Sequence, residues 1–534
     1  MSKSCNWFRD ISLAVLISMV PQLASAEVRL ASIFADHMVL QRDAEIPVWG
    51  WANPGEQISL QLAGQTQTVT AGADGKWMVR LTPIPAGGPY KLSISGSNTL
   101  AINDVLIGEV WLCSGQSNMA MTVNRALNFD AERGAANAPT IRHFKTSAHA
   151  AVEPHSDCQG TWQVCSSETV GGFSAAAYFF AKRLTQELNV PVGLVNSSWG
   201  GTDIAAWTSL DAQAAVPEIV PKLDAYDAII SKYDPDQAQA NHKLALEQWE
   251  KRAANAKAAG RATPRKPTMV GDPRTNQNRP ANLYNGMIHP LIPFAIRGAI
   301  WYQGERNSHS VSDGRLYEHQ LKALISDWRS RWHQGDFPFL TVQLPNYHAP
   351  TEQPIENTGW VIVRESQLRS LAIKNTGLAV TTDIGEANDI HPRNKQVVGE
   401  RLALWALGTT YNQDIEYFGP QFVFCQFRDG SVNAQGKINP GRMMLSFLHA
   451  DELKSADGQP FRGFAVADED QVFYPAEATI ETSTGFLQLS SRQVRTPRAA
   501  RYNWSDNPNG NLVNGAGLPA APFRTDSWEI SDPE

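Results

Sequence analysis

Clusters of basic residues, metal-binding cysteine patterns and long apolar runs are all scarce in this chain of 534 residues. Its formal net charge is -7, and no block of lysine or arginine indicates nucleic acid or an anionic membrane as a partner. No cysteine–histidine spacing resembles a zinc site, so we expect neither a metal nor another cofactor. Only one long apolar run is present, near the N-terminus, which excludes a multi-span membrane protein.

The start of the chain is typical of a secretory signal peptide. Lys3 and Arg9 precede the apolar run 11–20, and Ala-Ser-Ala at 24–26 offers small residues for cleavage near Ala26. The alternative is an N-terminal membrane anchor, but the run is too short to span a bilayer comfortably. We therefore expect residues 1–26 to be removed and the rest to be secreted or periplasmic, without a membrane anchor.

The cysteines fit an oxidising compartment. Cys5 leaves with the predicted signal peptide. Cys158 and Cys165 are close enough in sequence to close a small disulfide loop. Cys113 lies in an apolar run and is expected to be a buried thiol.

The periodicity divides the rest of the chain into three parts. Short alternating runs separated by turn clusters predict a β-sandwich at 27–103. Strands then alternate with helices at 104–410, which indicates a parallel sheet, and the stretch from about 210 to 280 is predicted to be a helical insertion. Residues 411–534 return to a β-rich pattern. The 16 tryptophans suit stacking on sugars, although we expect most of them in the core.

Ser117 stands at the predicted end of a strand. An apolar run at 109–114 leads into Gly-Gln-Ser-Asn-Met at 115–119, so a glycine turn places a hydroxyl at the start of a helix. The first N–H groups of a helix are free to donate there. Such a serine can act as a nucleophile if a histidine takes its proton. The alternative is an ordinary helix N-cap.

Three further loops follow predicted strands. Ser-Ser-Trp-Gly-Gly-Thr occupies 197–202, Gln-Gly-Glu-Arg-Asn occupies 303–307, and Asp-Ile-His-Pro occupies 389–392. Taken singly, these are a glycine turn, a polar loop and an exposed loop histidine. In a parallel sheet all of them open on the same edge as Ser117, so they are able to converge.

Together the four motifs resemble the sialate O-acetylesterase family, a branch of the SGNH (GDSL-like) hydrolases. The resemblance extends to residues 33–41, 283–291, 511–512 and 522–524, and so covers nearly all of the mature chain. It implies an α/β protein whose SGNH-hydrolase core has three α/β/α layers and a parallel sheet, flanked by N-terminal and C-terminal β-rich modules. It also implies hydrolysis of acetyl esters on sugars.

The resemblance assigns catalytic roles. Ser117 becomes the nucleophile, and His391 becomes the base that later protonates the leaving hydroxyl. The oxyanion hole is expected to combine the N–H of Ser117, an N–H of Gly200 or Gly201, and the side-chain amide of Gln303. The side chains expected to bind substrate are Gln116, Asn118, Trp199, Glu305 and Asn307.

The acid of the triad is less clear. The superfamily usually carries it three residues before the histidine, where this chain has Asn388. Asp389 is the nearest acid and is our first choice. Asp383, Glu305 or a backbone carbonyl are the alternatives. His289, which precedes Pro-Leu at 290–291, is expected to be a core histidine.

These features predict a serine-type carbohydrate O-acetylesterase. Its substrate is expected to be an acetylated sugar, either sialic acid or a plant hemicellulose such as xylan or xyloglucan. Two alternatives stay open. One is a carbohydrate-binding protein with an inactive hydrolase core. The other is a lipase or thioesterase, against which the lack of a long apolar lid counts.

Overall fold

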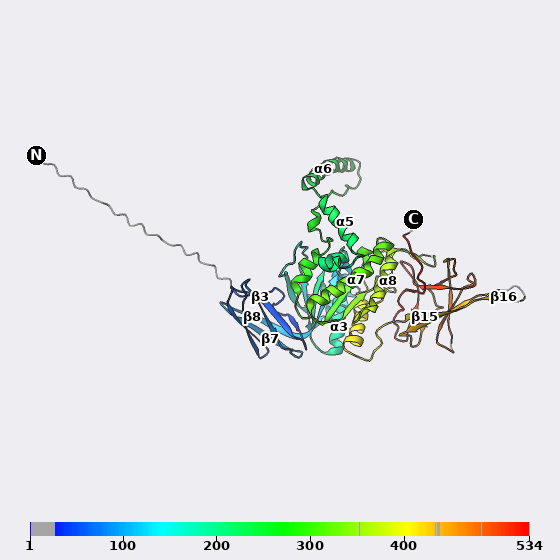
Figure 1. The fold of residues 1–534 in the computed structure, drawn as a ribbon, viewed down its shortest axis with the longest axis horizontal. Helices are drawn as coiled ribbons and strands as arrows, with labels where there is room; N and C mark the ends of the chain where they lie inside the picture. The colour runs from blue at the N-terminus through cyan, green and yellow to red at the C-terminus, as the bar shows by residue number, and fades with distance from the viewer. Residues whose placement is uncertain (2–26, 352, 433, 435–437, 482, 533–534) are drawn as a thin grey trace.

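The computed structural model describes Met1 and residues 27–351, 353–432, 434, 438–481 and 483–532. The predicted signal peptide lies almost wholly outside these residues. An N-terminal β module, a central α/β core and a C-terminal β module follow one another along the long axis (Figure 1). Within the described ranges, no helix has both the length and the apolar character that a membrane crossing requires.

The N-terminal module consists of two sheets over a shared apolar core. One sheet is antiparallel and contains β1 (Arg29–Leu30), β3 (Ile46–Trp51) and β6 (Lys76–Leu81). The other contains β4 (Gln57–Leu62), β5 (Gln65–Thr70) and β7 (Gly87–Ser95). Strands β4 and β6 alternate buried and exposed side chains, as expected where one face packs on the core.

Strand β8 (Thr99–Gly115) joins this module to the core. Its first part pairs with β7, and β2 (Val39–Gln41) lies parallel to it at Leu106–Gly108. Its last part pairs with core strands on both sides. Its burial changes from alternating to continuous along the strand. The predicted boundary near residue 103 therefore falls inside one strand, with no linker.

The core sheet has the order β10-β9-β11-β8-β12-β13-β14. Neighbouring strands are parallel except for β10, which is antiparallel to β9. The strands besides β8 are β9 (Asn137–Thr146), β10 (Gly160–Ser166), β11 (Val192–Ser198), β12 (Gly298–Tyr302), β13 (Phe339–Val342) and β14 (Thr376–Ala379). The strands that follow β8 in the chain lie on both sides of it, β11 on one side and β12 on the other. The strand order therefore reverses at β8, and ligands commonly bind at the carboxyl end of a strand in this position.

Helices cover both faces of this sheet. On one face α3 (Ala175–Leu188) packs on α9 (Lys395–Trp405), and on the other α7 (Val311–Trp332) packs on α8 (Gly359–Arg369). The side chains of β12 alternate between the two: Ile300 joins the α3–α9 cluster, and Trp301 joins the α7 cluster. The predicted three-layer α/β/α core is confirmed.

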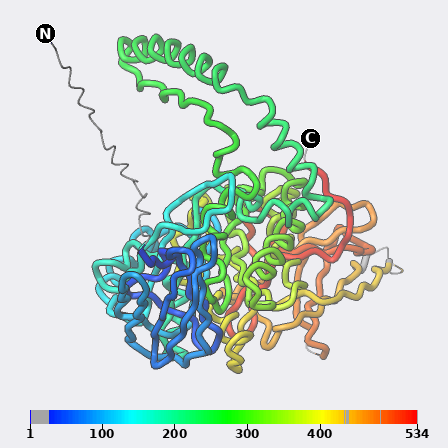
Figure 2. The backbone as a smooth tube through the Cα atoms, turned by 60° about the vertical axis from the view of Figure 1, so that its left-hand side comes forward, coloured from blue at the N-terminus to red at the C-terminus, as the bar shows by residue number. Residues whose placement is uncertain are grey.

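A helical arm stands clear of the body (Figures 1 and 2). It consists of α6 (Pro235–Ala258) and the outer end of α5 (Val220–Ser231), whereas α4 (Leu210–Ala214) and the start of α5 pack on α7. Asp234 caps the start of α6 by accepting N–H groups from Asp236 and Gln237. The indole of Trp249 donates to the carbonyl of Pro264 at 2.7 Å, which ties α6 to the returning chain. The arm corresponds to the insertion expected at about 210–280.

The C-terminal module is a second β-sandwich. The two main sheets are β15 (Gln421–Arg428), β18 (Arg442–Leu448), β23 (Leu487–Ser490) and β22 (Glu477–Ile480), and β21 (Phe473–Pro475), β20 (Phe464–Ala467), β24 (Ala499–Tyr502) and β26 (Phe523–Arg524). Smaller pairs are β16 (Ser431–Val432) with β17 (Ile438–Asn439) and β19 (Lys454–Ser455) with β25 (Leu512–Val513). Leu445 and Leu489 of one sheet share a core with Val466 and Tyr502 of the other.

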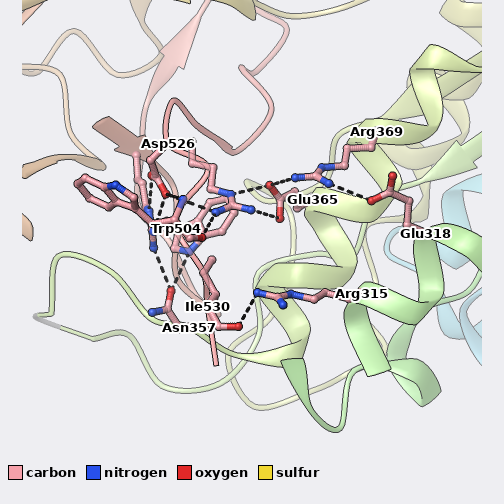
Figure 3. Close-up of polar contacts among 11 residues, drawn as sticks. Arg315, Glu318, Asn357, Glu365, Arg369, Trp504, Asp526 and Ile530 are labelled. Carbon is pink, nitrogen blue, oxygen red and sulfur yellow. Dashed lines mark hydrogen bonds and ion pairs between the residues drawn. The ribbon is translucent and has the colours of Figure 1, made fainter. Parts of the chain in front are cut away.

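One buried ion pair docks this module on α8, and a second pair lies within the module beside it (Figure 3). Arg524 of β26 pairs with Glu365 at 2.7 Å, and Arg501 pairs with Asp526 at 3.0 Å. The side chains of Arg501 and Asp526 are only 3% and 2% exposed. Arg364 is fully buried and donates to four backbone carbonyls, two of them in the C-terminal segment. The module is therefore bonded into the core.

The disulfide loop that the spacing of Cys158 and Cys165 would allow is not formed, because both thiols are free and buried. Cys158 packs in the cluster on the α7 face of the sheet, whereas Cys165 packs in the cluster on the α3 face. Burial raises the pKa of Cys158 to about 12 and that of Cys165 to about 11. Both are therefore protonated at neutral pH, as expected for inert core thiols.

Breaking the buried pair should loosen the C-terminal module. Asp526→Asn leaves the buried Arg501 without its carboxylate, while Arg524 keeps Glu365, so we expect the free energy of unfolding to fall by about 3 kcal/mol in urea denaturation. Arg80→Met is the control, because the Arg80–Glu45 pair is exposed (53% and 55%) and should cost below about 1 kcal/mol. Equal losses in the two variants would contradict a stabilising role for the buried Arg501–Asp526 pair.

Candidate active site

The serine sits where β8 ends at the switch point. Ser117 is the first residue of the short helix α1 (Ser117–Ala120) and is half-buried. Gly115 has a φ of 133°, and a Cβ there would lie 2.2 Å from the carbonyl oxygen of Tyr302, so only glycine fits this turn. The N–H of Gln116 donates to the same carbonyl at 3.0 Å. The turn is thereby fixed against β12.

His391 reaches Ser117 from the far end of the core. Its Nε2 lies 2.8 Å from the Ser117 Oγ, although 274 positions separate the two residues. The imidazole is 30% exposed, so both groups can be reached from solvent. An imidazole at this distance can take the proton of the hydroxyl and so turn it into a nucleophile.

The histidine loop is held by the start of α9. The side chain of Asn394 caps this helix by accepting from the N–H of Val397. Glu386 accepts from the N–H of Arg393 at 2.8 Å. The loop between β14 and α9 therefore ends in a capped helix, which limits its freedom.

The electrostatic surroundings keep His391 neutral. Burial lowers the pKa of His391 below its usual value near 6.5. The carboxylate of Asp389 opposes this shift, whereas the cations of Lys395 and Arg125 add to it. The imidazole is therefore mainly unprotonated at neutral pH, as a general base must be.

Asp389 is the acid nearest to the imidazole, but the contact is loose. Its Oδ1 lies 3.5 Å from the Nδ1 of His391 and accepts the backbone N–H of His391 at 2.8 Å. Asp389 is also half exposed (51%). The other candidates are engaged elsewhere: Asp383 binds Arg401 through both oxygens at 2.6 Å, and Glu305 binds Asn118.

The glycine pair lies directly beside the serine. A Cβ added to Gly200 would be 3.3 Å from the Cβ of Ser117. Gln277 and Asn278 donate to the carbonyls of Gly200 and Gly201 and so hold this loop. Within the described part of the chain, the N–H groups of Ser117, Gly200 and Gly201 donate to no other group. They can therefore serve as donors to a developing oxyanion.

The prediction for Gln303 needs correction. Its side chain is fully buried, and its amide nitrogen donates to the carbonyl of Thr202 at 3.0 Å and to Oδ1 of Asn307 at 2.7 Å. Both amide hydrogens are therefore in use, and neither remains for an oxyanion. Gln303 instead ties the third motif to the glycine loop.

Most of the residues predicted to bind substrate are also internal. Asn118, Glu305, Asn307 and Gln116 are buried, with exposures of 0%, 6%, 1% and 3%. Asn307 accepts from the N–H of Ile204 and donates to Asp203 and Gln320. Gln116 accepts from the N–H of Arg306. These four side chains support the site from inside. The prediction that they contact the substrate directly therefore needs correction.

Trp199 is the exception among the predicted substrate contacts. It is half-buried, and its backbone N–H donates to the carbonyl oxygen of Gly115 at 3.1 Å. Trp199 therefore lies beside the turn that precedes Ser117. His289 lies outside the site and bonds to the carbonyl of His155 at 2.7 Å. Among the described residues, no group of three His, Cys, Asp or Glu side chains is close enough to hold a metal.

Lys395 is a neighbour of the site that the sequence reasoning missed. It is fully buried and donates to Asn118 at 2.7 Å and to the carbonyl of Pro392 at 2.6 Å. It is also the first residue of α9, where the helix dipole disfavours a cation. A lysine at a helix start so close to His391 was the signal that could have identified it.

The fold and the site define an enzyme with a hydrolase core of three α/β/α layers. A family model described as "Carbohydrate esterase, sialic acid-specific acetylesterase" matches residues 107–261 and 267–407. The chain belongs to this family, and it is an esterase of the carbohydrate acetylesterase kind.

Similar proteins span nearly the whole chain. The rat sialate O-acetylesterase is 30% identical over 93% of both chains. The human sialate O-acetylesterase is 28% identical over 92% of this chain and 90% of its own. The crystal structure of a carbohydrate acetylesterase from Xanthomonas citri has a TM-score of 0.77, is 36% identical, and covers 94% of this chain and 100% of its own.

The depressed pKa of His391 predicts the pH dependence of catalysis. Activity needs the neutral imidazole, so kcat/KM should fall as the pH drops through this pKa, with a midpoint below 6.5. Asp389→Asn removes the charge that raises this pKa, so the midpoint should move to still lower pH. A pH–rate profile with an acid limb at or above 6.5 would contradict the assignment.

Crowding the serine should slow catalysis. In Gly200→Ala the new methyl group meets Ser117 at 3.3 Å, and a displacement of a few tenths of an ångström should lower kcat about tenfold. Gly172→Ala is the control, since nothing lies within 4 Å of its added Cβ. Steady-state kinetics on an aryl acetate compare the two. Wild-type kcat in Gly200→Ala would exclude a close role for this loop.

Proposed function

We propose that this protein removes acetyl groups from sugars by a serine mechanism, with Ser117 as nucleophile and His391 as general base. The observation that carries the proposal is the 2.8 Å contact between the Ser117 Oγ and the His391 Nε2. Membership of the acetylesterase family supports the same reaction.

The first half of the reaction forms an acetyl-enzyme. His391 takes the proton of Ser117 as the Oγ attacks the carbonyl carbon of the ester. The negative oxygen that develops accepts from the N–H of Ser117 and from the N–H of Gly200. The carbon–oxygen bond to the sugar then breaks, and His391 gives its proton to the leaving hydroxyl.

The second half regenerates the enzyme. His391 takes a proton from a water molecule, whose oxygen attacks the acetyl carbonyl on Ser117. The same N–H groups stabilise the second tetrahedral intermediate. When it collapses, acetate leaves and Ser117 regains its proton from His391. Oxygen and proton counts balance with water as the only co-substrate.

The substrate we propose is an acetylated sugar, either a sialic acid or a plant hemicellulose such as xylan or xyloglucan. Similarity to sialate O-acetylesterases and to a carbohydrate acetylesterase supports this class. Trp199, half-buried next to the glycine pair, offers an aromatic surface for a sugar ring. We further propose export to the periplasm or the medium, since the first 26 residues have the pattern of a signal peptide.

Replacing the nucleophile tests the mechanism. Ser117→Ala should lower the hydrolysis of an aryl acetate by at least about 10³-fold, because no other group can form the acetyl-enzyme. Ser114→Ala is the matched control, three residues earlier on β8. Its hydroxyl is buried and has no hydrogen-bond partner among the described groups, so activity should stay near wild type. Undiminished turnover in Ser117→Ala would overturn the proposal.

A substrate panel separates the alternatives. Acetate release should be measured from acetylated sialic acid, acetylated xylan and acetylated xyloglucan side by side. A preference for longer acyl chains on model esters would indicate a lipase or thioesterase instead. No release from any sugar, together with no labelling by a fluorophosphonate probe, would indicate a binding protein with an inactive core.

A further inference from the structure

Three buried polar side chains connect the serine helix to the histidine loop. They are Glu305 of the third motif, Asn118 of α1 and Lys395 of α9. Asn118 and Lys395 are both 0% exposed, and Glu305 is 6% exposed. Asn118 is the residue next to Ser117, so this chain of contacts begins at the nucleophile.

The contacts end on both sides of His391. Asn118 donates through Nδ2 to the carbonyl of Ile390 at 3.0 Å, and Lys395 donates through Nζ to the carbonyl of Pro392 at 2.6 Å. Ile390 and Pro392 are the two neighbours of His391 in the chain. The peptide group directly before His391 and the one directly after Pro392 are therefore held by side chains.

The two donors are also fixed relative to each other. Lys395 Nζ donates to Oδ1 of Asn118 at 2.7 Å, which leaves Nδ2 of Asn118 to face Glu305 Oε1 at 2.5 Å and the carbonyl of Ile390. Every polar atom of the Asn118 amide is therefore bonded. Because water does not reach these groups, a broken contact would leave a buried donor unpaired, which is costly.

The usual alternative for orienting the histidine is weak here. The Asp389 carboxylate is half exposed and 3.5 Å from Nδ1, and the oxygen nearest the ring already accepts a backbone N–H. A loose, solvated contact restrains a ring less than buried hydrogen bonds do. The restraint must therefore come largely from elsewhere.

We propose that Asn118 and Lys395 are positioning residues that hold His391 against Ser117 through the carbonyls on either side of it. They carry most of the orienting task that an acid performs in a Ser-His-Asp triad. This proposal rests on the proposed function, because it assigns the support of the same base.

The positioning does not require a charge on the lysine. Burial lowers the pKa of Lys395 to about 7, against the opposing effect of Glu305, Glu386 and Asp389 and with the help of Arg125. Burial raises the pKa of Glu305. A neutral amine still has hydrogens for both of its acceptors. The hydrogen bonds to Asn118 and Pro392 therefore persist on either side of neutrality.

Three single variants test the proposal by steady-state kinetics on an aryl acetate. We expect Lys395→Met and Asn118→Leu each to lower kcat about 10²-fold with KM within about threefold, because the base is misplaced while the binding surface is kept. We expect Asp389→Asn to lower kcat less than about tenfold. Lys182→Met is the control. It removes the ion pair between Lys182 of α3, the helix that packs against α9, and Glu132 of the short helix α2 (Phe129–Ala135), and it should leave kcat unchanged.

The pH profile separates positioning from general damage. The Lys395 cation lowers the pKa of His391 and Asp389 raises it, while Arg125 is present in all variants. The acid limb of kcat/KM should therefore move to higher pH in Lys395→Met and to lower pH in Asp389→Asn. A variant that is merely less folded would have a lower kcat/KM at every pH, with the acid limb of the profile at the wild-type pH.

Each outcome decides between the two proposals. Near-wild-type kcat in Lys395→Met and Asn118→Leu, with a loss of about 10³-fold or more in Asp389→Asn, would overturn the positioning role and leave the serine mechanism intact. Activity in Ser117→Ala would overturn the mechanism itself.

A double variant covers the case in which Lys395→Met does not fold. Lys395→Met with Glu305→Gln leaves no uncompensated buried charge, so its melting temperature should stay near wild type while kcat remains low. Loss of fold in both this double variant and Asn118→Leu would show a role in stability alone and would overturn the proposal.

Discussion

The hydrogen bond between Ser117 and His391 depends on the rest of the core, which must bring two distant loops together. It joins residues 274 positions apart at 2.8 Å, so neither loop can find its partner locally. A parallel sheet solves this problem, because the ends of β8, β11, β12 and β14 open on one edge and the loops after them meet there. Gly115 allows the serine turn to pass against β12, and the capped start of α9 brings the histidine back.

Buried polar side chains beneath this edge of the sheet hold the loops together, a role that the sequence motifs do not indicate. From the sequence we expected three side chains to face the substrate: Gln303, Asn307 and Asn118. In the structure each of them forms hydrogen bonds with neighbouring loops instead. Loops cannot pack by apolar contact alone, because their backbone groups need partners when buried. The three side chains supply those partners and so hold the loops that carry Ser117 and His391.

The sequence was sufficient for the layers of the core and for the four loops that meet at its edge. Hydrophobic runs and glycine turns indicate these features locally, and the structure brings Ser117, Gly200 and His391 together at that edge. It was insufficient for the direction in which a side chain points. Cys158 and Cys165 are near in sequence but pack on opposite faces of the sheet, and spacing alone does not show this. Lys395 was missed although its place at the start of a helix, four residues after His391, was a signal; the sequence does not show that its amine is buried.

Strand β8 also has a mechanical consequence. Since one unbroken strand belongs to the N-terminal sandwich at its start and to the catalytic sheet at its end, no hinge separates the two bodies. Rotation of the sandwich relative to the core would have to break the hydrogen bonds between β8 and its neighbouring strands, which run up to the turn before Ser117. The N-terminal module therefore lies at a constant distance from Ser117.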